Sequence, residues 1–304
     1  MAKTSQIKGG NLLITGGSGF IGSYIIDALK DEFDIVVADL IKPSAKDILF
    51  HKIDLRKPFS ISADFKTCIH LAGFVGGIQY FTKHPVENVR DNPKITGNVF
   101  DACINAGTNH LLYTSSSVVY QHQKQYPTKE EDVLSSPPPT SAYGISKLVG
   151  EYFCRAYNEQ FGLKYTVLRP FNAYGPGEAP DIDYAHVIPQ LIEKVLSNQY
   201  PVEIYGNGNQ TRTFTHGSDI GRAFKMCINN KSAYSETFNV AGNKELKIIE
   251  KMGGAVAAVE NSYMKNNLVK SMSQRVSDIE TGEQILSLIH ISAPTRLGMI
   301  SYAV

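Results

Sequence analysis

The chain has 304 residues, of which 42% are apolar and 19% charged, the composition of an ordinary globular protein. With 30 basic and 29 acidic side chains its net charge is +1, which excludes binding of nucleic acid or an anionic membrane through bulk charge. The N-terminus is polar, and no stretch of the sequence reaches the roughly 18 apolar residues that span a bilayer, so a cytoplasmic protein is expected. The cysteines lie far apart in apolar runs, where we expect reduced, buried side chains and no metal site: Cys68, Cys103, Cys154 and Cys227.

The first 170 residues alternate between apolar strand patterns and helical patterns. Strands are expected at 11–15, 35–39, 48–53, 67–71, 110–114 and 165–170, and helices at 20–30, 86–106 and 142–161. Ser141 is placed to cap the last of these helices, after a stiff run of three prolines. Buried strands separated by helices predict an α/β fold, a Rossmann-type doubly wound parallel sheet covered on both faces.

The regular alternation stops after residue 170. Residues 171–284 are interpreted as a smaller C-terminal substrate-binding portion, because loops and shorter elements dominate there. Residues 285–304 show neither helical nor strand periodicity and resemble translated adapter sequence. We therefore expect this tail not to be native sequence and the natural C-terminus to be missing; the alternative is a genuine but irregular tail.

A glycine-rich turn joins the first expected strand to the first expected helix. Gly16–Gly22 fits both G-x-G-x-x-G and G-x-x-G-x-x-G. Glycines permit a tight turn and let backbone N–H groups approach a pyrophosphate, which the positive end of the following helix also attracts. The preceding strand and the following helix give the context that a dinucleotide-binding fingerprint requires.

Asp39 ends the second expected strand, 20 residues after Gly19. A carboxylate at this place accepts hydrogen bonds from a ribose 2′-hydroxyl and repels a 2′-phosphate, so NAD is favoured over NADP. Two alternatives stay open: Asp39 as a solvated carboxylate at a strand end, and NADP binding through the nearby Lys42 and Lys46.

Tyr143 and Lys147 are separated by four positions, which places a phenol and an ammonium on one helix face. A tyrosine titrates at about pH 10, too high for efficient proton transfer at neutral pH, and a neighbouring positive charge is expected to lower that pKa. Ser115, Ser116 and Ser117 follow the strand at 110–114, and carboxyl strand ends border the ligand crevice of a parallel sheet. One of these hydroxyls is placed to hold a substrate oxygen beside Tyr143; the alternative is that the serines only close a turn and the Tyr–Lys spacing is coincidental.

Together these motifs resemble the nucleotide-sugar epimerase/dehydratase family of extended short-chain dehydrogenases/reductases. The similarity runs in order from about residue 11 to 284, through the segments Gly16–Gly22, Asp39, His70–Gly73, Ser115–Ser117, Tyr143/Lys147 and Arg169–Gly177. In that family the catalytic serine or threonine precedes a tyrosine in an S-x-x-x-Y pattern, which Ser116 and Tyr120 match. The resemblance therefore implies catalytic roles for Ser116, Tyr143 and Lys147, and a NAD-binding domain over residues 1–170.

The resemblance also implies ligand contacts. Those to NAD come from Gly16, Gly19, Phe20, Ile21, Gly22, Asp39, Asp54, Leu55, Leu71, Ala72, Gly73, Asn92, Tyr143, Lys147 and Pro170. Those to a nucleotide-sugar substrate come from Ser117, Asn172, His186, Arg212 and Arg275. Asn172 and Arg212 match positions that hold the diphosphate, and Arg275 matches one that reaches the nucleotide. The usual R-D-F around the clamping arginine is R-T-F here, which puts the local support of Arg212 in doubt.

The residues after Ser116 separate the branches of the family. Dehydratases and decarboxylating relatives carry an acidic residue there, whereas this chain has Ser117 and Val118. The 3,5-epimerase/reductases that make GDP-fucose use a cysteine where Val118 stands, although His186 matches their catalytic histidine. The sequence is therefore most similar to the 4-epimerases of the UDP-glucose type, which oxidise C4, rotate the 4-keto sugar and return the hydride. The alternatives are a GDP-4-keto-6-deoxyhexose 3,5-epimerase/reductase and a non-catalytic NAD-binding protein. Family members usually pair through two helices, here 86–106 and 142–161, which implies a homodimer.

Overall fold

A seven-stranded, wholly parallel sheet forms the centre of the protein in the computed structural model, which describes residues 6–7, 10–178, 185–199, 202, 211–228 and 230–242. The strand order is β11-β8-β7-β6-β2-β3-β4. The strands are β2 (Leu12–Thr15), β3 (Ile35–Asp39), β4 (Leu49–Lys52), β6 (Thr67–His70), β7 (His110–Thr114), β8 (Lys164–Pro170) and β11 (Glu236–Val240). The predicted doubly wound, Rossmann-type sheet is confirmed, and its expected strands lie within one or two residues of the observed ones.

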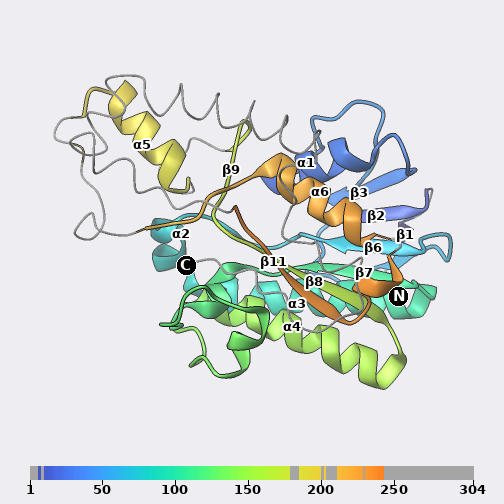
Figure 1. Ribbon diagram of the computed structural model, residues 1–304. Coiled ribbons are helices and arrows are strands. Elements are labelled where there is room, and N and C mark those ends of the chain that lie inside the picture. The colour runs from blue at the N-terminus through green and yellow to red at the C-terminus, as the bar shows by residue number, and fades with distance from the viewer. Residues whose placement is uncertain are drawn as a thin grey trace, which may run out of the picture.

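Helices cover both faces of this sheet (Figure 1). On one face α1 (Phe20–Leu29) packs against α6 (Gly217–Cys227), and on the other α3 (Asn92–Ala106) packs against α4 (Ala142–Phe161). Side chains alternate along each strand, so that Leu13 joins the core under α3 and α4 while Leu12 and Ile14 join the core under α1 and α6. Two apolar cores, one on each face, therefore hold the three layers together.

One predicted helix is divided in two. The pattern at 86–106 predicts a single α-helix, but a π-helical turn covers Glu87–Asp91 before α3 begins at Asn92. Pro93 stands in the first turn of α3. It has no N–H to bond the carbonyl four residues earlier, so the hydrogen-bond pattern of an α-helix cannot run through this point. A widened turn of the π type satisfies the backbone instead.

Part of the chain after residue 170 returns to the sheet. Strand β11 pairs in parallel with β8 as the edge strand, and α6 lies in the outer layer beside α1. The prediction that residues 171–284 bind substrate stays a prediction, but α6 and β11 within that range complete the layers of the sheet domain. Away from the sheet lies α5 (Val187–Leu196), at the upper left of Figure 1.

The remaining elements are short. Two small parallel pairs join β1 (Gln6–Ile7) to β5 (Ser60–Ile61) and β9 (Ala173–Tyr174) to β10 (Thr215–His216). The short helices are α2 (Ile78–Lys83) and the 3-10 turns Ser117–Tyr120, Glu130–Leu134 and Lys231–Ala233. The four cysteines are free and buried, as expected. Within the described ranges, no helix has the length and apolarity needed to cross a bilayer.

The sheet order creates one crevice. From β2 the chain proceeds outward to β3 and β4, and it then crosses back so that β6 lies on the other side of β2. Loops that leave adjacent strands in opposite directions open a gap at the carboxyl ends of those strands, which is where open α/β sheets bind ligands. The glycine turn after β2 and the segment after β6 border this gap.

Candidate functional site

The turn after β2 depends on glycine at two positions. Gly16 has a φ of +73°, and a Cβ there would lie 2.5 Å from the backbone nitrogen of Ala72, so this turn packs directly on the segment after β6. A Cβ on Gly22 would lie 2.5 Å from the carbonyl oxygen of Gly17, so the first turn of α1 packs equally closely on the loop. Gly19 is the N-cap of α1 and supplies no capping side chain. The N–H groups at the start of α1 are therefore left to a ligand or to water.

Asp39 lies at the end of β3 and is bonded to the glycine turn. Its Oδ2 accepts a hydrogen bond from the Ser18 N–H at 3.1 Å, and its Oδ1 accepts one from the Leu40 N–H at 2.6 Å. The Ser18 hydroxyl in turn donates to the carbonyl of Ile41 at 2.5 Å. The carboxylate thus stands beside the glycine turn, as the fingerprint predicts, and its remaining lone pairs can accept from a ligand hydroxyl.

Asp54 follows β4, and its carboxylate holds an arginine. Arg56 donates to it through Nε at 2.8 Å and through Nη2 at 2.9 Å, and these bonds hold the pKa of Asp54 below its ordinary value. Leu55 is buried, and its carbonyl accepts from the Asn98 amide at 2.8 Å. Both residues therefore have clear structural partners in addition to the predicted contact with NAD.

Asn92 holds the segment that follows β6 in place through hydrogen bonds. Its Oδ1 accepts from the Phe74 N–H at 2.6 Å, and its Nδ2 donates to the Phe74 carbonyl at 3.1 Å and to the Ser146 hydroxyl at 3.3 Å. A Cβ on Gly73 would lie 3.2 Å from the same Oδ1. Asn92 stands directly after the π-helical turn, and such turns are frequent at functional sites. It thus fixes the segment that carries Leu71 and Ala72 against α4.

A one-way hydrogen-bond chain crosses the floor of the crevice. The Thr96 hydroxyl donates to the carbonyl of Asn92 at 2.9 Å, so it accepts from His70 Nε2, which lies 3.1 Å away. His70 Nδ1 must then accept from the Thr15 hydroxyl at 2.8 Å. Burial and, to a smaller extent, the charge of Lys147 lower the pKa of His70 to about 3, so the ring is neutral. The ends of β2 and β6 are joined through this single tautomer.

Tyr143 and Lys147 lie on one buried face of α4, as their spacing predicts. Ser141 caps this helix by accepting from the Gly144 N–H at 3.1 Å. Ser116 stands at the carboxyl end of β7 as N-cap of a 3-10 turn, close enough to the Tyr143 phenol to lower its pKa. The Lys147 ammonium lies 5.7 Å from the centre of the Tyr143 ring and donates to the carbonyl of Thr114 at 2.8 Å. The structure thus brings together the serine, tyrosine and lysine selected from the sequence.

The sequence-based expectation for the pKa of Tyr143 is wrong for this arrangement. Burial raises that pKa to about 12, although Ser116 opposes the rise. Lys147 does not offset the effect of burial on Tyr143: its ammonium lies 5.7 Å from the ring centre, and burial lowers its own pKa to about 8. Desolvation therefore outweighs the neighbouring charge for both groups.

The ring of Tyr143 is also covered on one face. Phe81 of α2 stacks on it with centroids 4.4 Å apart and ring planes 12° from parallel. The N-terminal end of α2 packs on another segment in turn, because Gly77 lies directly against the carbonyl of Ala185, just before α5. Neither contact was foreseen from the sequence, since a lone phenylalanine carries no signal of its partner.

The NAD dependent epimerase/dehydratase family matches residues 12–241. The chain belongs to this family. A putative UDP-glucose 4-epimerase from Methanocaldococcus jannaschii is 32% identical over 250 residues, 79% of each chain. A GDP-L-fucose synthase from Sinorhizobium fredii is 30% identical over 258 residues, 80% of this chain and 78% of that one. Among solved structures, MoeE5 in complex with UDP-glucose and NAD has a TM-score of 0.68 at 31% identity, covering 82% of this chain and 81% of MoeE5.

Membership of the family confirms the resemblance drawn from the motifs and makes NAD the cofactor. The residues present fit that cofactor. The glycine turn leaves the N–H groups of α1 open, and Asp39 stands beside it. Thr114 adds a buried hydroxyl at the carboxyl end of β7, with no hydrogen-bond partner in the described part of the chain. When bound, NAD supplies the hydride acceptor of the family's redox step.

The described residues among those predicted to hold substrate lie after β7, after β8, before β10 and at the start of α5. Asn172, whose φ is +31°, donates from its amide to the carbonyl of Thr213 at 2.9 Å, which ties it to the segment of Arg212. Thr213, which replaces the usual aspartate, is buried, and Arg212 itself is exposed and donates to the neighbouring Thr211 carbonyl at 2.7 Å. His186 is the N-cap of α5.

His186 Nδ1 lies 2.5 Å from a Glu178 carboxylate oxygen. Ser117 follows Ser116 in the half-buried part of the 3-10 turn. Pro170 ends β8, directly before the Asn172 segment. Arg275 and residues 285–304 lie outside the described residues.

Proposed function

We propose that the protein is a nucleotide-sugar epimerase that inverts C4 through a transient 4-keto intermediate on bound NAD. One observation carries the proposal: Ser116 acts on the Tyr143 phenol beside Lys147, while the positions after Ser116 hold Ser117 and Val118 instead of an acid. Reversible oxidation of an alcohol needs one proton-transfer group. Elimination of water, or epimerisation at C3 and C5, needs a further acid or base. The side chains around Ser116 fit the simpler reaction.

In the proposed reaction Tyr143 first loses its phenol proton to solvent and then, as the phenolate, takes the proton of the sugar 4-hydroxyl while hydride leaves C4 for the acceptor that NAD would supply. Ser116 holds the same oxygen by a hydrogen bond, and Lys147 stabilises the phenolate that Tyr143 must form. Phe81 keeps water from one face of the Tyr143 ring. After the keto-sugar rotates, Tyr143 returns its proton as hydride re-enters C4 from the opposite face. Both cofactor and protein are then back in their starting states, so no second substrate is consumed.

The substrate is proposed to lie across the carboxyl edge of the sheet with its diphosphate between Asn172 and Arg212. The Asn172–Thr213 hydrogen bond supports this placement, because it holds the two segments together. Arginine suits the role, since its planar fork bonds phosphate oxygens bidentately. Residues 171–284 would thus supply most of the substrate contacts, with Ser117 and Arg275 as further proposed ones.

The contact between His186 and Glu178 supports a second candidate function. His186 is oriented by the Glu178 carboxylate, and a histidine held by a carboxylate is a common acid–base arrangement. This favours the 3,5-epimerase/reductase alternative, and the GDP-L-fucose synthase relative points the same way. Against it, Val118 cannot exchange protons at the place of the second acid.

Association into a homodimer through α3 and α4 is also proposed. Tyr152 is 59% exposed on α4, and Phe161 at the end of that helix and Val89 in the preceding π-helical turn are exposed too. Apolar side chains presented on adjacent helices suit a partner surface. Sedimentation velocity at several concentrations measures the state directly, and a monomer at every concentration would refute this proposal.

Product analysis tests the proposed reaction. Purified protein with NAD is incubated with UDP-glucose, UDP-galactose and the GDP and dTDP counterparts. The sugar nucleotides are then separated and quantified. Interconversion of a C4 pair without net NADH is expected, and Tyr143→Phe should lower the rate by roughly 10²–10⁴-fold without weakening NAD binding. Tyr126→Phe, the same change at an exposed place outside α4, is the matched control. Net reduction of a GDP-4-keto-6-deoxy sugar would instead establish the reductase alternative.

A further inference from the structure

A third member of the α4 face, Glu151, lies one turn beyond Lys147. Tyr143, Lys147 and Glu151 stand at intervals of four residues, so all three project from the same side of the helix. Glu151 is only 1% exposed. A carboxylate this deeply buried is rare unless its charge is paired and its oxygens are bonded.

Glu151 joins two strand ends that border the crevice. Its Oε1 accepts from the Ser115 hydroxyl at 2.5 Å and from Arg169 Nε at 2.8 Å, and its Oε2 accepts from Arg169 Nη2 at 2.7 Å. Ser115 directly precedes Ser116, and Arg169 stands three residues before Asn172. One carboxylate on α4 therefore holds the residue next to the candidate serine and the arginine three positions before the candidate diphosphate contact.

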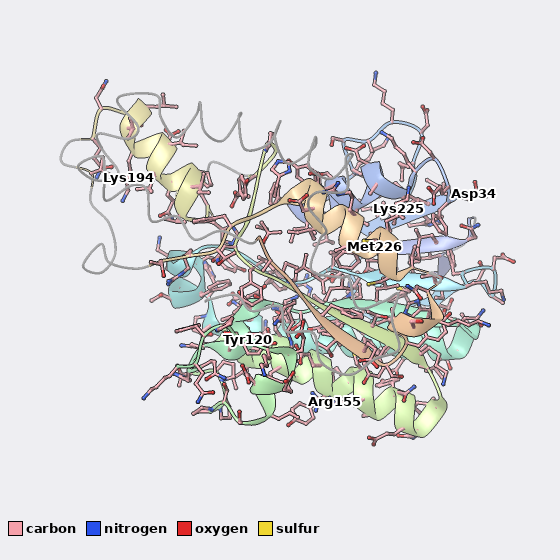
Figure 2. All side chains as sticks on the ribbon, in the orientation of Figure 1. Asp34, Tyr120, Arg155, Lys194, Lys225 and Met226 are labelled. Atoms are coloured by element: carbon pink, nitrogen blue, oxygen red, sulfur yellow. The ribbon has the colours of Figure 1, made fainter. Side chains whose placement is uncertain are left out.

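The network continues beyond Arg169. This side chain is also 1% exposed, and it donates to the carbonyl of Glu130 at 2.9 Å and to the hydroxyl of Tyr120. Tyr120, labelled in Figure 2, is fully buried and donates to Asn239 of β11 at 2.9 Å. Glu130 then accepts from the Asn239 N–H at 2.8 Å. Burial alone would lower the pKa of Arg169, but the bonds and charge of Glu151 more than offset it and raise that pKa above its usual range.

Stability alone does not account for this pair. A buried ion pair is often no more stable than apolar side chains of the same volume, because desolvation of both charges offsets their attraction. The bonds of Glu151 and Arg169 instead fix the relative positions of α4, the end of β7 and the end of β8, and the residues proposed for catalysis and diphosphate binding stand on or next to these elements.

Glu151 also differs in charge from the other groups that face Lys147. Tyr143 on the same helix is neutral because burial raises its pKa to about 12, and Tyr113 of β7 is neutral because burial raises its pKa well above the ordinary value. His70 of β6, with a pKa of about 3, is neutral as well. Burial lowers the pKa of Lys147 to about 8, and the charge of Glu151 opposes that fall. Among the described residues, Glu151 is the one anion that acts on the lysine.

We propose that Glu151 is a positioning residue of the active site, holding the Ser115–Ser117 turn and the end of β8 in register with Lys147 and supplying the negative charge that keeps Lys147 protonated. Arg169 is its necessary partner, because its two hydrogen bonds let the Glu151 carboxylate stay ionised in a buried place on α4, next to Lys147. This inference deepens the proposed function and rests on it for its kinetic readout, but not for the titration described next.

The titration measures Lys147 directly in the full-length protein. Lysine side chains are isotopically labelled, the Lys147 signal is assigned by its loss in Lys147→Arg, and its shift is followed by NMR against pH. In the native chain the midpoint is expected near 8, and in Glu151→Gln it should fall by about one pH unit or more. Glu159→Gln, an exposed change on the same helix, should leave the midpoint in place. An unmoved Lys147 midpoint in a folded Glu151→Gln would overturn the electrostatic role whether or not the protein epimerises sugars.

Kinetics separate positioning from mere folding. In Glu151→Gln the alkaline limb of kcat should move to lower pH with the Lys147 midpoint, while KM for the sugar nucleotide changes by less than about threefold. Reduced stability with an unshifted limb would overturn the proposal.

Two further variants guard against a misfolded Glu151→Gln. The double change Glu151→Gln/Arg169→Gln leaves no unpaired buried charge, and its Lys147 midpoint should also be low. Ser115→Ala removes one hydrogen bond only, and kcat should fall roughly tenfold at unchanged KM. A native kcat in Ser115→Ala would overturn the claim that Glu151 positions the Ser115–Ser117 turn for catalysis.

Discussion

The same substitution at two helical glycines should have opposite effects on stability. A Cβ on Gly150 of α4 would overlap the phenol oxygen of Tyr113 and would lie 2.8 Å from its Cε1. Tyr113 is 3% exposed and packs against Phe100, and its hydroxyl donates to the Lys147 carbonyl at 3.4 Å, so the ring has little room to move. A Cβ on Gly97 of α3 would meet nothing within 4 Å.

The expected magnitudes follow from two terms. Alanine in a helix interior is more stable than glycine by roughly 0.5–1 kcal/mol, and this gain applies at both positions. Overpacking in a buried site costs about 1–3 kcal/mol, and the overlap with Tyr113 places Gly150 at the upper end. Gly150→Ala should therefore lower the free energy of unfolding by about 2 kcal/mol, whereas Gly97→Ala should raise it by about 0.5–1 kcal/mol.

Urea unfolding followed by circular dichroism measures both variants against the native chain. The midpoints should move in opposite directions at an unchanged m-value. Runs at two protein concentrations reveal any contribution from subunit association, because linked unfolding depends on concentration. A Gly150→Ala variant as stable as Gly97→Ala would show that Tyr113 yields without cost, and the packing argument would be wrong.

Three other expectations follow from the site. Gly22→Ala places a Cβ 2.5 Å from a backbone carbonyl of the glycine turn and should weaken NAD binding at least tenfold by calorimetry; native affinity would contradict the tight-turn account. Burial lowers the pKa of His70 to about 3 and that of His110 to about 4, so the unfolded chain binds more protons below pH 6.5 and stability should fall from pH 6.5 toward 5, by about 1.4 kcal/mol per pH unit for each ring. His110→Gln should roughly halve that slope in urea unfolding at stepped pH, and an unchanged slope would exclude the ring as a source. Phe81→Ala admits water to Tyr143 and should lower its pKa, so the acid limb of the kcat profile should move to lower pH; a fixed limb would limit Phe81 to packing.

Local patterns predicted the sheet and the edge that carries the site. Strand β2 and the cap at Ser141 follow from a few adjacent residues, and the position of Ser116 at a strand end follows from the parallel topology. Such features are set by backbone geometry within one element or by a rule that holds for every parallel sheet. The spacing of Tyr143 and Lys147 was sufficient to place both on the face of α4 that meets the serine.

Features that depend on burial or on distant partners were not predicted. The pKa of Tyr143 moves upward because the surrounding protein excludes water, and the sequence alone does not reveal that exclusion. The partners of Glu151 lie 36 residues away, just after β7, and 18 residues away, in β8, although its spacing from Lys147 was a signal that could have been used. Pro93 was a local signal that the helix predicted at 86–106 would be divided at the start of α3.

The hydrogen-bond chain through His70 determines where a proton can travel. Every O–H and N–H in it points from Thr15 toward the Asn92 carbonyl, and the neutral ring is bonded on both nitrogens. Passing a proton along such a chain would require each donor to reverse, and the ring would have to carry a charge that its burial opposes. This series of hydrogen bonds therefore does not conduct protons at the base of the crevice. In the proposed epimerase reaction, a proton taken up by Tyr143 would therefore not be lost to solvent by this route and would be retained for return to the same substrate.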